Sequence, residues 1–278
     1  MKPLSVIATT LVSLLVGSAS ANGAVMFCDT GPVSAAAINA HSLETVTWSP
    51  LGRPERGWQI YAPMIAQEIG TGCSAISAGF AATLASWQEN HNAPGTGVMD
   101  SQTFKLMKEL WQDRRPFVAI SHILCPEPPN ESKLAVARAD ESYAGKEIRL
   151  LPGALAAYRK MVAAARAQLL AVAANRQLLT IFSGYRSPSY DAARCARQNN
   201  CQGLVRATCS PHRTGLAMDV YLGSAPGYGP DSSADVNRLY LSGSQAYRWL
   251  VYNAWRFGFV NYVFEPWHWE WTGEPLHE

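Results

Sequence analysis

Six cysteines follow an N-terminal stretch typical of an exported protein. Export matters for the fold because cysteines can form disulfide bonds in an oxidising compartment. After a positively charged start, residues 4–16 form an uncharged, mostly apolar run. The small residues at 19–21 (Ala-Ser-Ala) then match the site that a signal peptidase accepts. We therefore expect residues 1–21 to be a signal peptide, cleaved after Ala21, and the mature chain to be exported. An uncleaved membrane anchor is the alternative, because no charge occurs after the first two residues until past Cys28, although the apolar run is short for a span.

All six cysteines survive this cleavage, so we expect disulfide bonds in an oxidising compartment. They are Cys28, Cys73, Cys125, Cys195, Cys201 and Cys209. Sequence alone does not choose among the possible pairings, but the last three cysteines lie close together, which favours at least one local bridge among them. A metal cluster is the alternative, and none of the spacings is the Cys-x-x-Cys pair typical of such a cluster.

The composition is that of an ordinary folded protein. Hydrophobic residues make up 48% of the chain and charged residues 16%, which excludes a disordered or low-complexity chain. The 23 basic and 21 acidic residues leave a net charge of +2, which argues against nucleic acid as a partner. Beyond the N-terminal run no stretch approaches the length of a membrane span, so we expect no stable span after signal cleavage.

Hydrophobic periodicity and breaker residues divide the mature chain into four segments. Residues 22–54 are a lead-in, residues 55–115 a helical domain, residues 116–147 a proline-containing linker, and residues 148–278 an α+β domain. Within the last segment, the pattern predicts helices at 152–175 and 245–257 and buried strands at 178–182, 218–222 and 259–264.

Two residues seven positions apart, His212 and Asp219, form a first candidate metal site. Imidazole and carboxylate groups bind zinc at about 2.0 to 2.2 Å. On a straight strand this spacing would separate them by about 20 Å. Thr214 and Gly215 supply a bend between them that would bring both side chains to one ion.

A second cluster lies in a strand-like stretch near the C-terminus. Trp267, Trp269 and Trp271 alternate along the chain, which predicts one aromatic face, and His268 and Glu270 share the opposite face. Taken alone, this pattern is equally typical of a packed aromatic face with solvated polar residues opposite.

Two further charged residues lie at the ends of predicted strands. Glu265 precedes Pro266, which indicates a turn or a strand start outside the simple alternation. Arg186 lies in the sequence Ser-Gly-Tyr-Arg-Ser just after the strand predicted at 178–182. Its guanidinium could bind a carboxylate with two hydrogen bonds, although an arginine at a strand end is usually a surface charge.

Three motifs occur in chain order: S-G-Y-R-S, S-x-H-x-x-G-x-A-x-D and E-x-W-H. Together they resemble the zinc D-Ala-D-Ala carboxypeptidases of the vancomycin-resistance type. These enzymes belong to a wider group that includes lysostaphin and the hedgehog signalling domain. The resemblance covers residues 148 to 272. It implies a hedgehog/D-Ala-D-Ala peptidase-like α+β fold, in which helices flank a small antiparallel sheet.

The resemblance also implies a role for each motif residue. His212, Asp219 and His268 would be the ligands of one zinc ion (Zn²⁺), which leaves a fourth position open as in catalytic zinc sites. Glu265 would be the catalytic acid/base, which takes a proton from the attacking water and delivers it to the departing amine.

Two other residues would bind the substrate. Arg186 would anchor the terminal carboxylate, and Ser210, the motif serine, would support it. The segment between these two residues contains three cysteines and several arginines, and it could line the substrate groove. Strand periodicity alone leaves Glu270 as a rival base; Glu265 is preferred only because of the family pattern.

A second resemblance covers residues 55–115. Three short stretches resemble the second half of a peptidoglycan-binding domain, which is a small three-helix bundle. They are Trp-Gln at 87–88, Thr-Gly-Val-Met-Asp at 96–100 and Thr-Phe at 103–104. A generic helical hairpin with a Thr-Gly turn is the alternative.

Together the resemblances predict an exported, two-domain cell-wall enzyme, periplasmic or secreted, whose partners are peptidoglycan stem peptides and glycan strands. The predicted reaction is removal of a terminal D-alanine. Three alternatives remain open: a cross-link endopeptidase, which open access around Arg186 would favour; a non-catalytic wall-binding protein, which a fourth protein ligand to zinc would favour; and a secreted peptidase acting on ordinary proteins.

Overall fold

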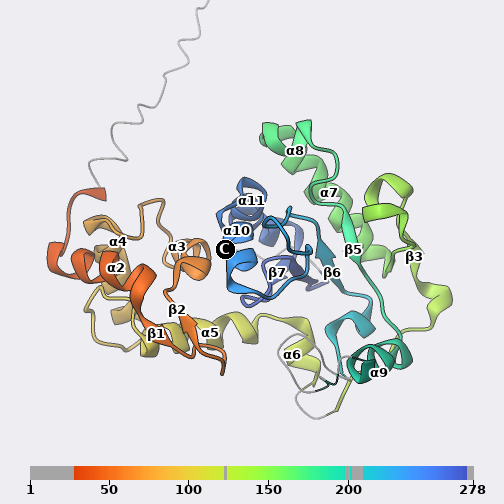
Figure 1. Cartoon of the computed structure of the whole chain (residues 1–278), viewed down its shortest axis with the longest axis horizontal. Helices are drawn as coiled ribbons and strands as arrows, with labels where there is room; N and C mark the ends of the chain where they lie inside the picture. Colours follow the sequence, from red (N-terminus) through yellow and green to blue (C-terminus); the bar gives the residue numbers. More distant parts are fainter. Residues whose placement is uncertain (1–27, 122–123, 198, 200, 202–208, 274–278) are drawn as a thin grey trace, which may run out of the picture.

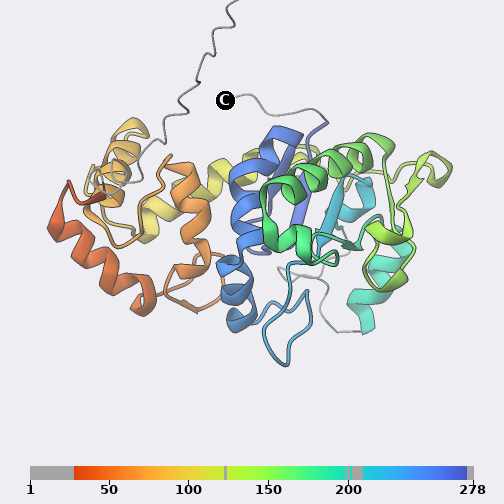
Figure 2. The ribbon, with the colours of Figure 1, turned by 90° about the horizontal axis from the view of Figure 1, so that it is seen from above.

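The computed structural model describes residues 28–121, 124–197, 199, 201 and 209–273. The predicted signal peptide lies outside these residues. The N-terminal helices form one lobe and the main sheet with its helices forms the other, and helices α10 and α11 lie between them (Figure 1, Figure 2).

The N-terminal lobe is mostly helical. Its elements are α2 (Val33–Thr45), β1 (Thr47–Trp48), β2 (Glu55–Arg56), the 3₁₀ turn η1 (Gln59–Tyr61), α3 (Ala62–Glu68), α4 (Ala78–Asn90), α5 (Ser101–Asp113) and α6 (Pro116–Ser121). Ser77 caps α4 by accepting a hydrogen bond from the amide of Phe80, and Asp100 caps α5 by accepting one from Thr103. Helix α2 contacts α4, so an ordered helix occupies part of the segment expected to be a lead-in.

The C-terminal lobe combines short strands and helices. Its first elements are η2 (Glu131–Lys133), β3 (Ala135–Val136), η3 (Ala139–Glu141), η4 (Tyr143–Gly145), β4 (Arg149–Leu150), α7 (Pro152–Gln168), α8 (Leu170–Ala174), β5 (Ile181–Ser183) and α9 (Pro188–Arg197). They are followed by η5 (Pro211–Thr214), β6 (Ala217–Val220), α10 (Asp235–Gly243), α11 (Gln245–Asn253), η6 (Ala254–Phe257), β7 (Phe259–Asn261) and β8 (His268–Trp271).

The central sheet has the strand order β5-β6-β8-β7, and every neighbouring pair is antiparallel. Helices around a small antiparallel sheet make the domain α+β, which confirms the predicted fold class. The predicted strands are present but shorter than expected, because the chain leaves each ladder after three or four residues. The long helix predicted at 152–175 breaks at Leu169, whose extended backbone separates α7 from α8.

One hydrophobic core runs through both lobes. It includes Trp58, Phe80 and Phe104 in the N-terminal lobe and Phe259 and Trp269 in the C-terminal lobe. The lobes therefore pack through apolar side chains and do not merely lie beside each other.

The side chain of Arg238, in α10, is fully buried where the lobes meet. It donates hydrogen bonds to Glu55 Oε1 (3.1 Å) and Tyr61 Oη (2.7 Å) of the N-terminal lobe and to the carbonyl oxygen of Phe264 (2.8 Å). Because all these groups are buried, they satisfy one another in place of water.

Three disulfide bonds join all six cysteines, and they confirm the predicted local bridge. The pairs are Cys28–Cys73, Cys125–Cys209 and Cys195–Cys201. The second pair ties the segment predicted as a linker to the residue before Ser210. That segment also contains β3, which pairs with β4 of the following segment in an antiparallel ladder. Among the described residues, no helix is long and apolar enough to cross a membrane.

Candidate active site

Local geometry brings three of the predicted site residues together. His212 lies in η5, Asp219 in β6 and His268 in β8, and Asp219 and His268 are direct partners in the antiparallel ladder. Gly215 ends η5 with a φ of 71°, a left-handed conformation that glycine adopts without strain. This turn sends the chain back into β6, so the predicted bend between His212 and Asp219 is present.

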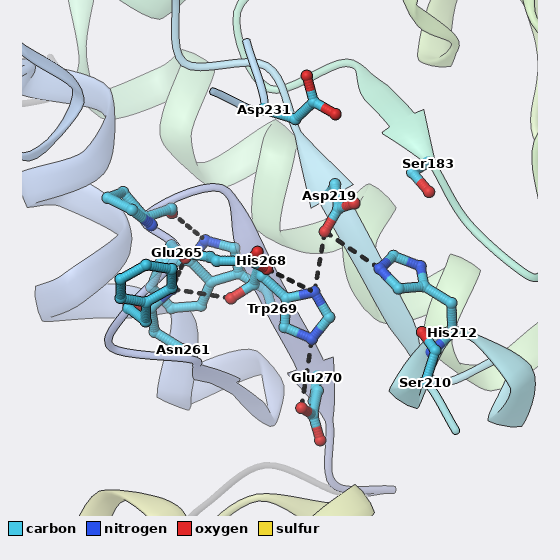
Figure 3. A network of polar contacts seen from close by, with 12 residues as sticks. Ser183, Ser210, His212, Asp219, Asp231, Asn261, Glu265, His268, Trp269 and Glu270 are labelled. Carbon is cyan, nitrogen blue, oxygen red and sulfur yellow. Dashed lines mark hydrogen bonds and ion pairs between the residues drawn. The ribbon is translucent and has the colours of Figure 1, made fainter. Parts of the chain in front are cut away.

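The three side chains converge on one point. Asp219 Oδ1 lies 3.2 Å from His212 Nε2 and 2.9 Å from His268 Nδ1. One potential ligand atom from each residue lies within 4.8 Å of the others, and all three residues are buried. Figure 3 shows both imidazole rings turned toward the Asp219 carboxylate.

The other ring nitrogens have partners on the far sides of the rings. His212 Nδ1 lies 2.7 Å from the carbonyl oxygen of Gly184, and His268 Nε2 lies 3.3 Å from Glu270 Oε1. Because these acceptors favour protonation of the far nitrogens, the near nitrogens can present lone pairs. Two imidazole nitrogens and a carboxylate are a donor set that fits zinc.

Burial and the neighbouring charges set the protonation of this cluster. Burial and the nearby Arg186 lower the pKa of His212 to about 4, which keeps this imidazole neutral. Burial opposes ionisation of Asp219, but His212 and His268 outweigh it and hold the pKa of the carboxyl well below its usual range. For His268, burial disfavours the cation, but hydrogen bonds to Asp219 and Glu270 outweigh it and raise the pKa to about 9. A metal ion at this point would therefore displace a proton from His268.

Glu265 lies at the turn that precedes β8. Its amide donates to the carbonyl oxygen of Tyr262 (2.8 Å) and its carbonyl oxygen accepts from the amide of His268 (2.9 Å), so the backbone on both sides is fixed. Glu265 Oε2 lies 4.0 Å from His268 Nδ1, the nitrogen that faces Asp219. Burial, reinforced by the negative charge of Asp219, raises the pKa of Glu265 to about 7.

Arg186 follows β5, and three side chains hold its guanidinium. Its Nε donates to Asp191 Oδ1 (2.7 Å), its Nη1 to Ser183 Oγ (2.7 Å) and its Nη2 to Ser210 Oγ (3.0 Å). The Ser210 hydroxyl also accepts a hydrogen bond from the amide of His212. Ser210 thus connects the arginine to the turn that carries the first histidine.

These residues share one cavity of about 310 Å³. Its lining includes Arg186, Ser210 and Glu265 together with the three clustered residues His212, Asp219 and His268. The predicted site residues, which the sequence spreads over 83 positions, therefore meet at one place. The Arg186 side chain is 12% exposed, so it lies within the cavity wall and not on the outer surface.

Glu270 is placed differently from Glu265. Its Oε1 accepts hydrogen bonds from Arg115 Nε (2.8 Å) and Nη2 (2.5 Å), and its Oε2 accepts one from the amide of Phe117 (3.1 Å). It lies on the side of the His268 ring away from Asp219 (Figure 3). Although burial opposes ionisation, the charge of Arg115 lowers the pKa of Glu270 to about 2.

Sequence reasoning missed Asp191 and Arg115. Asp191 follows Arg186 by five positions in the first turn of α9, and that proximity was the available signal. Arg115 lies just before α6, at the last position of the predicted helical domain, and no local pattern connects it with Glu270.

The C-terminal lobe matches a known protein family. Residues 148–274 match VanY, described as D-alanyl-D-alanine carboxypeptidase. This part of the chain is similar to the VanY family, and the match covers somewhat less than half of the whole chain. The VanY-type domain is therefore an enzyme of the carboxypeptidase kind, as its sequence motifs predicted.

Two solved structures are similar to part of the chain. The LdcB LD-carboxypeptidase is 20% identical, with a TM-score of 0.35, and the match covers 53% of this chain and 70% of that one. A mutant of the vancomycin-resistance D,D-pentapeptidase VanY, from a VanB-type resistance cassette and in complex with Zn(II), is 18% identical, with a TM-score of 0.31, and the match covers 52% and 83%. No curated protein matches the chain in sequence.

Proposed function

We propose that this protein is an exported zinc-dependent carboxypeptidase that removes the terminal D-alanine from peptidoglycan stem peptides. The observation that carries the proposal is the His212, Asp219 and His268 cluster, which lies with Glu265 and Arg186 in one cavity. A metal site, an acid/base and a carboxylate anchor are the groups that this reaction needs.

His212, Asp219 and His268 would hold one zinc ion. Their near atoms are His212 Nε2, Asp219 Oδ1 and His268 Nδ1. When bound there, zinc supplies Lewis-acid chemistry: it polarises a peptide carbonyl and makes water more acidic. The hydrogen bonds from the far ring nitrogens to Gly184 and Glu270 orient the two imidazoles for this task.

Glu265 would move the proton. A carboxyl group with a pKa of about 7 can accept a proton from the attacking water and return it to the departing amine near neutral pH. Glu265 is preferred over Glu270 because its carboxylate lies on the same side of His268 as Asp219, whereas Arg115 and Phe117 already occupy the oxygens of Glu270.

Arg186 would bind the free carboxylate at the end of the substrate. A guanidinium is suited to a carboxylate because it donates parallel hydrogen bonds. Asp191, Ser183 and Ser210 fix its orientation in advance, which would place the last peptide bond beside the metal cluster. Ser210 would therefore act on the substrate side through Arg186.

The alternatives receive less support. Arg186 is mostly enclosed, and an endopeptidase would need room for chain beyond this position. Within the described residues, the ligand cluster comprises three side chains and not four, which favours a catalytic site over a structural one. Glycan binding by residues 55–115 remains a prediction that rests on the resemblance alone.

Mass spectrometry tests the proposal. Stem pentapeptides and cross-linked muropeptides are each incubated with the zinc-loaded mature protein, and the products are identified. We expect loss of one alanine from the pentapeptide, and no reaction after chelation or with Glu265→Gln. Cleavage of cross-linked dimers alone would favour the endopeptidase. No metal-dependent product from either substrate would favour a non-catalytic wall-binding protein.

A further inference from the structure

The far nitrogen of His268 donates its hydrogen bond to a carboxylate that the N-terminal lobe holds in place. Glu270 Oε1 lies 3.3 Å from His268 Nε2. Its other partners, the guanidinium of Arg115 and the amide of Phe117, belong to the junction between α5 and α6. This junction precedes the family match, which begins at residue 148.

The Arg115 side chain is itself fixed from several directions. Its Nη1 donates to Gln112 Oε1 (2.8 Å), and its guanidinium carbon lies 4.2 Å from the centre of the Tyr262 ring. The side chains of Arg115 and Glu270 are 7% and 1% exposed. The pair is thus buried and held by several contacts, and it lies against the cluster of His212, Asp219 and His268.

A buried ion pair is a weak source of net stability, because desolvation of the two charges offsets most of their attraction. Replacement of such a pair by apolar residues of similar volume is often neutral or stabilising. The charged pair has a different consequence: a carboxylate held in one orientation fixes the tautomer and the rotation of the imidazole that it contacts.

We propose that Arg115 and Glu270 are positioning residues for the metal centre: Arg115 holds the Glu270 carboxylate, and the carboxylate orients His268 so that Nδ1 faces Asp219. The α5–α6 junction is therefore part of the metal centre, although its residues lie outside the VanY-type domain. This inference rests on the proposed zinc site and deepens it.

The test measures zinc affinity, by competition with a chromophoric chelator, in the full mature protein and two variants. Arg115→Gln removes the buried charge, and we expect zinc binding to weaken about 10- to 100-fold. Arg114→Gln is the matched control, because Arg114 is adjacent, exposed and paired with Glu68. We expect its zinc affinity to stay within about twofold of wild type.

A double variant separates positioning from folding. In Arg115→Gln the unpaired Glu270 would also destabilise the protein, whereas Arg115→Met with Glu270→Met removes both buried charges. We expect the double variant to regain the unfolding temperature of the metal-free wild type but to keep the weak zinc binding. Recovery of both properties would show that the pair serves folding alone and would overturn the inference.

The outcomes distinguish this inference from the proposed function. If the wild type binds no zinc, both fail. If the wild type binds zinc and Arg115→Gln binds it equally tightly, the proposed function stands and the positioning role is wrong.

Discussion

Asp191 Oδ1 accepts a 2.7 Å hydrogen bond from Arg186 Nε, and this contact fixes the guanidinium in the wall of the cavity. Asp191 is itself buried, and Ser183 and Ser210 accept hydrogen bonds from the remaining nitrogens of the arginine. An arginine that is oriented in advance loses less entropy when a substrate carboxylate arrives. In the proposed function, the contact between Asp191 and Arg186 would let a long side chain set the register of a short peptide.

Asp191→Asn should weaken this orientation. The charge-assisted hydrogen bond becomes a neutral one, so we expect KM for a stem pentapeptide to rise about tenfold with a smaller change in kcat. Steady-state kinetics on the pentapeptide and on its C-terminal amide check this. The amide has no carboxylate for Arg186, so its slow turnover should change little. Equal losses on both substrates would mean that Asp191 acts on folding and not on carboxylate binding.

Glu265 should contribute less to the stability of the metal-free protein as the pH rises. Burial raises its pKa from 4.5 to about 7, so the folded protein binds this proton more tightly than the unfolded chain does. The contribution of Glu265 to the free energy of unfolding therefore falls between pH 4.5 and 7, and the loss is complete above pH 7.

Glu265→Gln lacks this titration. In urea denaturation of chelated protein, we expect the variant to exceed the wild type by up to about 3 kcal/mol at alkaline pH and to match it at acidic pH. The opposite result would be a rise in the stability of the wild type, relative to the variant, between pH 4.5 and 7. It would show that the fold stabilises the charged carboxylate, and the pKa of Glu265 would then not be raised by burial.

Gly215 should matter for metal binding as well as for stability. A Cβ at this position would lie 3.0 Å from Leu134 Cδ2, and the φ of 71° strains any other residue. We expect Gly215→Ala to lose about 1 kcal/mol or more of stability and also to weaken zinc binding, because the turn sets the distance from His212 to Asp219. Thermal unfolding and chelator competition measure the two effects.

Gly227→Ala is the control for backbone strain. Gly227 also has a positive φ, of 83°, but a Cβ there meets nothing within 4 Å. We expect a similar loss of stability and unchanged zinc affinity. If both glycine variants bind zinc as the wild type does, the turn at Gly215 is not what positions His212.

The cluster of His212, Asp219 and His268 could be predicted because these residues lie in short motifs that together resemble a known family. His212, Gly215 and Asp219 lie within eight residues, and the strand alternation around His268 already separates the imidazole from the tryptophans. The bend and the strand that these motifs imply are both present. Strand lengths were overestimated, because apolar residues such as Phe264 continue past the last ladder hydrogen bond while remaining buried in the core.

The contacts between the lobes could not be predicted in the same way. Arg115 and Glu270 are separated by 155 positions, and Arg238 and Glu55 by 183, so no periodic pattern connects them. Helix α2 was also missed, since its alanine-rich sequence has no strong apolar stripe and its packing on α4 decides the structure.

The most direct test of the central claim is a zinc titration of the metal-free protein. The release of free D-alanine from a stem pentapeptide is measured at each step. We predict that the rate rises until one equivalent of zinc is bound, and that Glu265→Gln binds the same equivalent without releasing alanine. Alanine release by the chelated protein, or full activity of Glu265→Gln, would contradict the account.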